Sequence, residues 1–488
     1  MGEKDRYRND ELANSLFHNS QKLLNQIEQK KDIFIFTNST VDGIISGSII
    51  FNSIFNNGGY ATLRCLIQEG SEERGIEKQV EEILSGNHEF YIFLDFSFNF
   101  MENFKEILVK ENCLFVNIDP AVNESLQKYE HIVNPFLHHN NRVDEISSSG
   151  LTYLLIKNID RNIADKAFLP VIAALSKDQD IGESRSLVGM NKEILETAIG
   201  LNQLEQKKGL TISESDNSPI TDVIKNNIVH YIKDITWNSD ISIELVKDSG
   251  IVQRKDGNAK RFEDCTEEEF TRLADNIEKF LDSRSKIKTN YKIKDILLGF
   301  NYYLSYEEKG FLRNARSFAK VIDSCIINKK QGLAFAVCLG DRSKTLNDVF
   351  DQIILYNNQI KRISTQIFGE IWRFQTDQYY VFINGEGILD YNNINPFISF
   401  LERSISFSDK VICIRMMDNE EFYKFLIIKT RFCRFPLNTI EESIKEKSET
   451  QDIETKDKNH LEVKVPVANL EDFLSNIKKR ISNADSWF

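Results

Sequence analysis

The chain has 488 residues, of which 41% are hydrophobic and 11% aromatic, and it carries a formal net charge of −13 with a pI near 5.3. This length exceeds what one hydrophobic core usually serves, so two or three domains are expected, and an acidic surface repels nucleic acid unless a local basic groove forms. No apolar run approaches the roughly 18 residues of a membrane span, and no signal-peptide core follows the first residue, which predicts a soluble, cytoplasmic protein without membrane contact.

Residues 1–200 predict one α/β domain that begins with a helix. Leucines and isoleucines at helical spacing indicate an amphipathic helix over 10–30. Four short β-branched or aromatic runs follow as expected strands: 32–38, 60–68, 89–95 and 113–119. Helical patterns at 43–56 and 75–85 lie between them. This alternation of strands and helices predicts a parallel sheet.

Residues 201–330 show a mixed pattern that predicts a helical connector, and residues 331–488 alternate again as a smaller α/β domain. Helices are expected at 220–235, 266–282 and 345–368. Four apolar runs of the last domain are expected as strands: 332–340, 378–385, 410–417 and 421–429. Residues 441–459 carry mixed charge and almost no apolar side chains, which predicts a disordered loop. The terminal Trp487 and Phe488 are either a short docking segment for a partner or a frayed tail.

Polar residues gather in four short stretches of the chain: 37–43, 93–97, 117–122 and 174–180. Three of the four come directly after predicted strands. Because parallel strands present their carboxyl ends at the same edge of a sheet, these side chains should meet where α/β proteins hold ligands. The pattern therefore predicts the position of an active site.

The order and spacing of these stretches resemble the DHH phosphoesterase superfamily and, within it, the archaeal RecJ-like proteins. That resemblance implies His-x-Asp-x-Asp-Gly, an Asp after a strand, Asp-His-His and a further Asp, gathered around two manganese ions. Other stretches resemble the same family: 145–155, 187–210, 313–325 and 332–342. The resemblance covers most of the chain. It implies a parallel-sheet DHH domain and a smaller DHHA1-like α/β domain, joined by a helical linker region.

Several ligand positions that the resemblance implies hold other residue types. In the first stretch, Asn38 takes the position of the His and Thr40 that of the first Asp. In the third stretch, Pro120 and Ala121 take the positions of the two His residues. Asn and Thr are neutral, and Pro and Ala offer no side-chain donor atom. These four positions are therefore predicted to be degenerate.

Three acids of the implied ligand set remain, namely Asp42, Asp95 and Asp119. In the fourth stretch, Lys177 matches the metal-binding Asp, although a slip of one residue would place Asp178 there. A two-metal site needs a bridging carboxylate and enough anionic or imidazole ligands for both cations, so no such centre and no catalytic residue are expected. The three acids are expected to hold no metal, or one weakly bound hard cation. Manganese or magnesium as a cofactor belongs to the alternative of an active enzyme.

Carboxylates brought together without a metal raise one another's pKa and weaken the fold. We hypothesise that the ammonium of Lys177 replaces the lost metal as an internal counter-ion. The alternative is that Lys177 points into solvent and that the acids are partly hydrated.

Two further features bear on anion or nucleic-acid contact. Ser147, Ser148 and Ser149 open a predicted helix, where their hydroxyls either hold an anion or cap the helix. The family's Gly-Gly-Gly-His turn corresponds to residues 456–474, which keep His460 but none of the glycines. Only glycine permits such a close approach of the backbone to a ligand, so we expect the substrate-binding turn to be lost.

These changes in both implied domains predict a protein that acts by binding. Within the family, the chain resembles the RecJ-like partner of the GINS complex in archaea, which is related to the inert RecJ-descended subunit of the CMG helicase. That resemblance implies a nucleoid-associated replication scaffold, which links GINS to the MCM helicase and contacts single-stranded DNA. An active manganese-dependent single-strand exonuclease or small-nucleotide phosphodiesterase with an altered ligand set is the alternative. A regulatory module that binds a nucleotide is a third reading.

Overall fold

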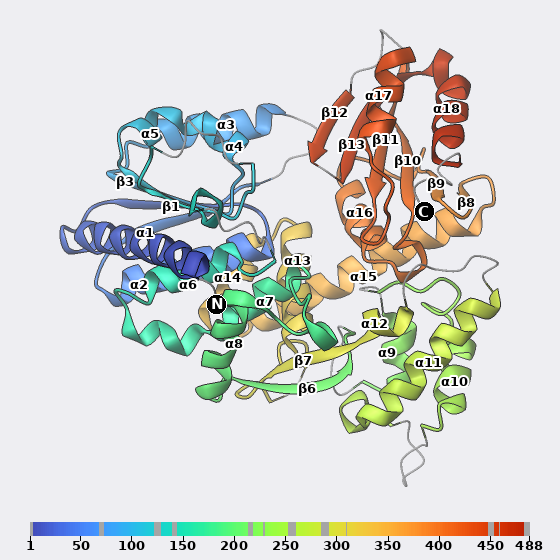
Figure 1. Cartoon of the computed structure of the whole chain (residues 1–488), viewed down its shortest axis with the longest axis horizontal. Coiled ribbons are helices and arrows are strands. Elements are labelled where there is room, and N and C mark those ends of the chain that lie inside the picture. The colour runs from blue at the N-terminus through green and yellow to red at the C-terminus, as the bar shows by residue number, and fades with distance from the viewer. Residues whose placement is uncertain are drawn as a thin grey trace. The chain divides into compact units, whose positions relative to one another are not determined.

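The chain folds into two compact units, shown in Figure 1. The computed structural model describes these residues: 3–67, 73–121, 128–138, 144–212, 218–227, 230–251, 260–284, 292–308, 310–447, 453–457 and 459–482. The first unit comprises Met1–Asn217 and Leu298–Ile354, and the second comprises Ser218–Leu297 and Leu355–Phe488. Within the described part of the chain, no helix has the length and apolar character needed to cross a membrane.

The first unit is built on a parallel five-stranded sheet with the order β2-β1-β3-β4-β5. The strands are β1 (Ile33–Thr37), β2 (Ala61–Cys65), β3 (Phe90–Leu94), β4 (Cys113–Val116) and β5 (Ile132–Val133). The helices are α1 (Glu3–Glu28), α2 (Val41–Asn56), α3 (Glu73–Ser85), α4 (Phe98–Met101), α5 (Lys105–Val109), α6 (Ser148–Ile156), α7 (Phe168–Ser176), α8 (Gly189–Gly200), α13 (Ala315–Ile327) and α14 (Gln331–Leu339). An antiparallel ribbon of β6 (Leu204–Leu210) and β7 (Leu298–Leu304) belongs to the same unit.

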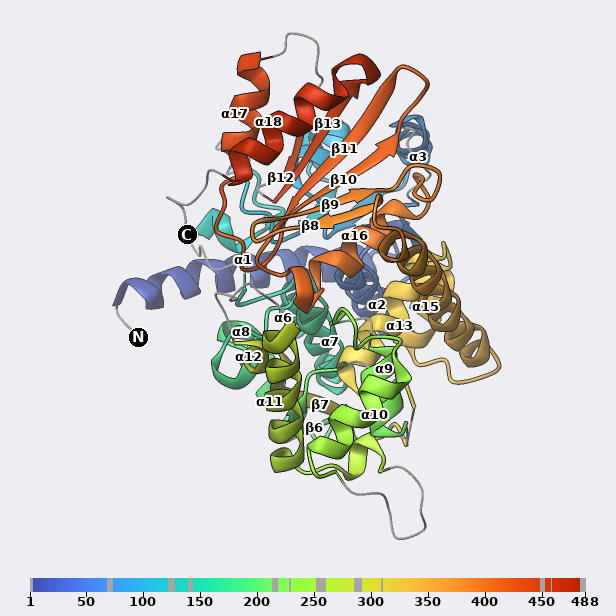
Figure 2. The same cartoon turned by 90° about the vertical axis from the view of Figure 1, so that its right-hand side faces the viewer.

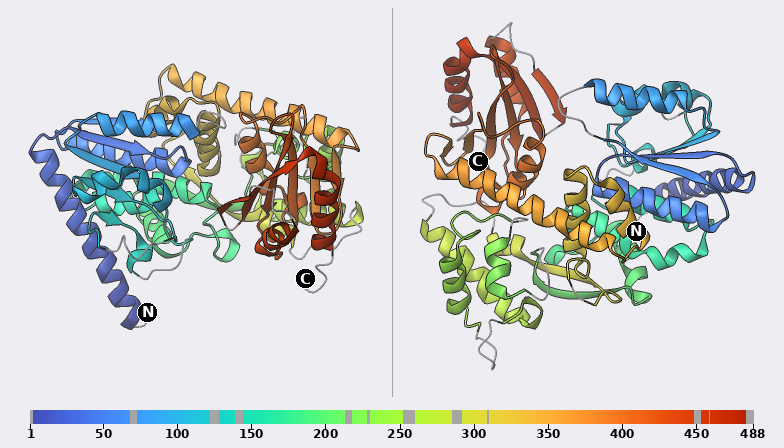
Figure 3. Two further views of the ribbon diagram at one scale, coloured as in Figure 1. Left: turned by 90° about the horizontal axis from the view of Figure 1, so that it is seen from above. Right: turned by 180° about the vertical axis from the view of Figure 1, so that it is seen from behind.

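The pleat of this sheet separates an aliphatic core from an aromatic one. In β1, Ile33 and Ile35 enter the core formed with α2, α6, α7 and α13, whereas Phe34 and Phe36 enter the core formed with α3, α4 and α5. Figures 1 and 3 show these two sets of helices on opposite faces of the sheet. A sheet covered on both faces requires continuous apolar strands. The four runs expected as strands in the first 200 residues are confirmed, three of them as fully buried strands and 60–68 as the partly exposed edge strand β2.

The second unit contains a mixed six-stranded sheet with the order β12-β13-β11-β10-β9-β8, in which only β9 and β10 run parallel. The strands are β8 (Phe374–Thr376), β9 (Tyr380–Asn384), β10 (Val411–Met417), β11 (Phe422–Lys429), β12 (Ile453–Asp457) and β13 (His460–Pro466). The helices are α9 (Ile220–Asn226), α10 (Ser239–Asp248), α11 (Glu267–Arg284), α12 (Ile293–Leu297), α16 (Ile394–Glu402), α17 (Asn438–Lys447) and α18 (Leu470–Ser482). Helix α15 (Thr345–Gly369) begins in the first unit and ends in the second.

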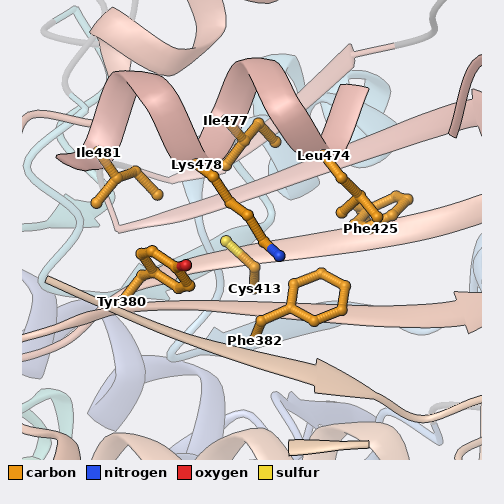
Figure 4. A pocket seen from close by; sticks show the side chains of 8 residues that line it. All are labelled: Tyr380, Phe382, Cys413, Phe425, Leu474, Ile477, Lys478 and Ile481. Atoms are coloured by element: carbon orange, nitrogen blue, oxygen red, sulfur yellow. The ribbon is translucent and has the colours of Figure 1, made fainter. Parts of the chain in front are cut away.

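Helices α17 and α18 cover one face of the second sheet, as Figure 2 shows. Under α18 lies a small apolar pocket, drawn in Figure 4, with room for one water molecule at most. Lys478 crosses this pocket, and its Nζ lies 5.5 Å from the centroid of the Phe382 ring and 3.1 Å from Gln375 Oε1. A lysine stem that covers apolar surface while its ammonium finds a polar partner is ordinary packing. The pocket therefore belongs to the core of the second unit.

The predicted fold class, a parallel-sheet α/β domain with a smaller α/β domain, is confirmed, but three local predictions are wrong. Residues 332–340 were expected as a strand and form helix α14, since the buried positions Ala334, Val337 and Cys338 follow a helical period. The expected loop 441–459 contains the end of α17 and strand β12. The expected connector is divided between the two units and contributes the ribbon β6–β7. Trp487 and Phe488 lie outside the described residues.

Candidate functional site at the carboxyl end of the parallel sheet

The loop after β1 brings the first polar stretch to the edge of the sheet. Thr40 is the N-cap of α2, and its hydroxyl accepts a hydrogen bond from Gly43 N at 2.9 Å. A side chain at Gly43 would place its Cβ 2.3 Å from the carbonyl oxygen of Asn38, so this tight turn admits only glycine. The cap and the glycine together turn Asp42 into the first turn of α2, where it is fully buried.

Asp42 is held by the amino end of α6 and by Lys177. Its two carboxylate oxygens accept hydrogen bonds from Ser148 N at 2.9 Å and from Ser149 N at 2.7 Å. The ammonium of Lys177 lies 2.8 Å from Asp42 Oδ2. A helix amino terminus carries partial positive charge and free N–H donors, so the hydrogen-bond and ion-pair partners of the buried Asp42 carboxylate are donors and a cation.

Asp95 follows β3 with a left-handed backbone, φ 62°, a conformation that Asp tolerates better than most residues. Its Oδ1 accepts from Ser148 Oγ at 2.7 Å and lies 3.0 Å from Lys177 Nζ. The Thr40 hydroxyl donates to its other oxygen. Asn38 donates to the Asp95 backbone carbonyl at 2.9 Å. Every oxygen of Asp95 therefore has a partner within the chain.

Lys177, at the carboxyl end of α7, bridges the two acids. The side chain of Lys177 is 29% exposed, against 0% for Asp42 and 7% for Asp95. The next residue, Asp178, has φ 53°, and its carboxylate lies 3.5 Å from Arg185 instead. The pairing with both acids excludes a solvent-facing Lys177. Of the two neighbouring side chains, Lys177 and not Asp178 enters the site.

Burial disfavours the charged form of all three groups and is the largest influence on each pKa. At Asp42, the charge and hydrogen bond of Lys177 and the hydrogen bonds of Ser149 outweigh burial, so the pKa lies below its ordinary value. At Asp95, burial together with the charge of Asp42 outweighs Lys177, so the pKa is raised. The pKa of Lys177 is raised because the two carboxylates outweigh its burial. Lys177 therefore stays charged, and Asp95 is the acid of the pair that takes up a proton first.

The third polar stretch serves local structure. Asp119 accepts from Phe98 N at 2.8 Å through one oxygen and from Ala121 N at 2.9 Å through the other. It thereby supports the start of α4 and the turn that follows β4. Pro120 and Ala121, which take the two expected His positions, are exposed. Asp119 is thus engaged away from the pair that shares Lys177.

The three serines have partners within the same network. Ser147 is the N-cap of α6 and accepts from Gly150 N at 2.9 Å, and its hydroxyl lies 3.0 Å from that of Ser149. All three serines are fully buried. In the second unit, His460 opens β13, and its Nε2 lies 2.9 Å from Glu402 Oε1. The geometry therefore favours capping by Ser147 and gives the serines and His460 partners inside the protein.

A buried cluster behind the site is not apparent from the sequence. Asp180 receives two hydrogen bonds from Arg185, at 2.8 and 3.1 Å, and one from Arg316 on α13 at 2.6 Å. Burial raises the pKa of Asp180, but the two guanidinium groups outweigh it and hold the pKa at about 2. Because Arg316 lies 136 residues further along the chain, no local spacing could have revealed the contact. The cluster anchors the end of the fourth stretch.

The described residues do not fit a two-metal centre, nor a single cation bound by the three retained acids. Within those residues, no group of three or more His, Cys, Asp or Glu side chains is arranged to hold a metal ion. The two acids that do approach each other already neutralise an ammonium, and their remaining oxygens accept from Ser148, Ser149 and Thr40. A metal would compete with Lys177 for the same carboxylates.

Solved structures with this fold exist at low sequence identity. CDC45 from Entamoeba histolytica is 12% identical with a TM-score of 0.61, and the match covers 96% of this chain and 99% of that one. An exonuclease RecJ bound to manganese is 10% identical with a TM-score of 0.54, over 96% and 94% of the two chains. A DHH domain described as a member of the s1p family of ribosomal proteins is 12% identical with a TM-score of 0.54, over 99% and 92%. No protein-family model and no curated protein matches the sequence. The chain therefore has the fold of RecJ and CDC45.

Proposed function

We propose that this chain is a RecJ-like member of the DHH phosphoesterase superfamily that has lost metal-dependent hydrolysis and acts by binding. The observation that carries the proposal is the ion pair of Lys177 with Asp42 and Asp95, at 2.8 and 3.0 Å. Hydrolysis of this class needs two cations and an open position for water. Because the ammonium of Lys177 occupies both carboxylates, neither requirement is met.

The partners that we propose are the GINS complex and the MCM helicase, with single-stranded DNA as a further contact in the nucleoid. The resemblance to the RecJ-like partner of GINS supports this assignment. The fold shared with CDC45 from Entamoeba histolytica, over 96% of this chain and 99% of that one, also supports it. The role that we propose is a scaffold between the two assemblies.

A nuclease assay tests the loss of hydrolysis. The purified full chain is incubated with end-labelled single-stranded DNA and manganese, and we expect no release of nucleotides. Asp95→Ala is assayed beside Glu196→Ala, a matched control because Glu196 is an acid of the same unit with a 64% exposed side chain on α8. Release that depends on manganese, disappears in Asp95→Ala and persists in Glu196→Ala would establish the alternative of an active enzyme.

Co-purification tests the scaffold role separately. We expect the full chain to be retained by tagged GINS and by tagged MCM, and to increase the retention of one by the other. A full-length, folded chain that binds neither assembly would contradict the proposed partners. That result would leave the proposed loss of hydrolysis unaffected, because only the nuclease assay tests it.

A further inference from the structure

A row of aromatic and arginine side chains crosses one end of the sheet in the second unit. This aromatic–arginine row consists of five residues in contact: Trp372, Arg373, Glu386, Arg415 and Tyr423. The Cζ atom of Arg373 lies 3.9 Å from the centroid of the Trp372 ring, and that of Arg415 lies 4.7 Å from the Tyr423 ring. Arg373 donates to the carbonyl of Glu386 at 2.7 Å, and Arg415 donates to its carboxylate at 2.9 Å. The contacts are continuous from Trp372 to Tyr423.

Strand register brings these distant residues together. Arg415 on β10 pairs with Asn384 at the end of β9, and Asn384 N donates to the carbonyl of Arg373 before β8 at 2.8 Å. On the other side of β10, Met417 pairs with Tyr423 at the start of β11. The ends of four strands therefore supply one surface.

Exposed apolar side chains lie at both ends of the row, and the arginines between them are held in place. Ile371 is 91% exposed, Trp372 57% and Met417 42%. Ile371 and Trp372 are adjacent in the chain and lie at one end of the row, and Met417 pairs with Tyr423 at the other end, so these side chains belong to one row and are not scattered singly. Trp, Tyr, Arg and Met are the residue types enriched at protein interfaces. The side chains of Arg373 and Arg415 are only 14% exposed, so they are ordered before a partner arrives and lose little entropy on binding.

The charges around the row select the class of partner. Carboxylates outnumber cations there, since the acids are Glu370, Glu386, Asp418, Glu420, Glu421 and Glu462 and the bases are Arg373, Arg415, Lys424 and Lys464. Both arginines already pair with carboxylates, Arg373 with Glu370 and Arg415 with Glu386. A phosphate backbone would meet net negative charge, which disfavours nucleic acid.

We propose that the aromatic–arginine row, with Ile371 and Met417, is a docking surface for a protein segment that presents apolar anchors among lysine or arginine side chains. The anchors pack on Trp372 and Ile371, and the cations of the segment face the acidic border. Because the row lies within the second unit, hydrolytic activity in the first unit would leave it unchanged. The surface thus has a test of its own.

The test uses the full chain and two labelled synthetic helical peptides, followed by fluorescence anisotropy. One peptide has Leu and Trp on one face and Lys on the other, and the second replaces each Lys by Glu. We expect the Lys peptide to bind and the Glu peptide not to bind, and we expect Trp372→Ala and Ile371→Ser each to weaken binding roughly tenfold or more. Phe55→Ser is the matched control, because Phe55 is 70% exposed in the first unit, and it should bind like the unsubstituted chain.

Several results would overturn the proposal. These are equal binding of the two peptides, no effect of either substitution in the row, an equal loss in Phe55→Ser, or displacement of the Lys peptide by oligo(dT) from the same surface. Sedimentation equilibrium measures whether a second copy of this chain occupies the surface. Self-association that Trp372→Ala abolishes would also overturn the assignment. If Trp372→Ala changes the thermal unfolding curve, its loss of binding could come from misfolding, and Ile371→Ser then decides the test. The Ile371 side chain is 91% exposed and contributes little to the stability of the fold.

Discussion

Replacing Lys177 by Met gives the sharpest test of its role as an internal counter-ion. Lys177→Met keeps most of the side-chain volume and removes the charge that lies 2.8 Å from Asp42 and 3.0 Å from Asp95. Removing one partner of a buried ion pair costs about 3–5 kcal/mol, because a buried charge remains uncompensated. The 29% exposure of the Lys177 side chain screens part of this, so we expect a loss of about 2–4 kcal/mol. For a domain of this size, that is a fall in Tm of roughly 5–10 °C.

The pH dependence of this loss separates electrostatics from packing. Lys177 is the cation that opposes the burial and the Asp42 charge that raise the pKa of Asp95, and Lys177→Met removes it. An acid whose pKa is raised in the folded state destabilises that state while it is charged, and the penalty disappears as the pH falls through the raised pKa. We therefore expect Lys177→Met to lose more stability near pH 8 than near pH 5. A lost packing contact would cost the same at both.

Urea unfolding followed by circular dichroism, in chelator, measures the effect. The matched control is Lys192→Met, because Lys192 pairs with Glu196 at 3.8 Å with both side chains more than 60% exposed, and such a pair contributes almost nothing measurable. Millimolar magnesium should restore part of the stability of Lys177→Met and leave the control unchanged. Equal losses in the two variants, or a loss independent of pH, would refute the counter-ion role.

Three further expectations concern the same unit. Gly43→Ala should destabilise it by about 2 kcal/mol or more in urea unfolding, because the added Cβ lies 2.3 Å from a backbone oxygen; unchanged stability would contradict the described turn. Asp180→Asn should lose about 3–5 kcal/mol, since two buried guanidinium groups lose the carboxylate that they share and only Arg185 keeps another, Asp178. In the unsubstituted chain, Asp180 has a depressed pKa, so its stabilisation is present above about pH 4 and about 2 kcal/mol of it is lost as the pH falls towards 2; acid titration of Asp180→Asn should lack this component. Finally, Thr40→Asp combined with Lys177→Asp should bind manganese by calorimetry where the unsubstituted chain does not, and equal binding by both would count against Lys177 as the replacement of the metal.

Much of the first unit could be predicted because its sheet is buried on both faces. Strands such as Ile33–Thr37 and Phe90–Leu94 consist almost wholly of apolar residues, and polar residues after such strands fall at the carboxyl edge by topology alone. Where tertiary packing selects between helix and strand, the apolar pattern predicted the wrong element or none. Residues 332–340 are as apolar as a strand, but packing on neighbouring helices selects the helical period of α14. The polar strand β6 was missed, because pairing with β7 provides its hydrogen bonds without an apolar pattern.

The sequence by itself determined which donor atoms this site lacks, because Asn38, Thr40, Pro120 and Ala121 have their chemistry whatever the fold. Only the tertiary structure decided how the remaining charges are arranged. Lys177 pairs with Asp95, which lies 82 residues away in the chain. The next residue, Asp178, has a left-handed backbone, and its carboxylate lies near Arg185 instead. The sequence specifies the type of each side chain. The direction of a side chain depends on backbone angles and on contacts that exist only after the elements have packed.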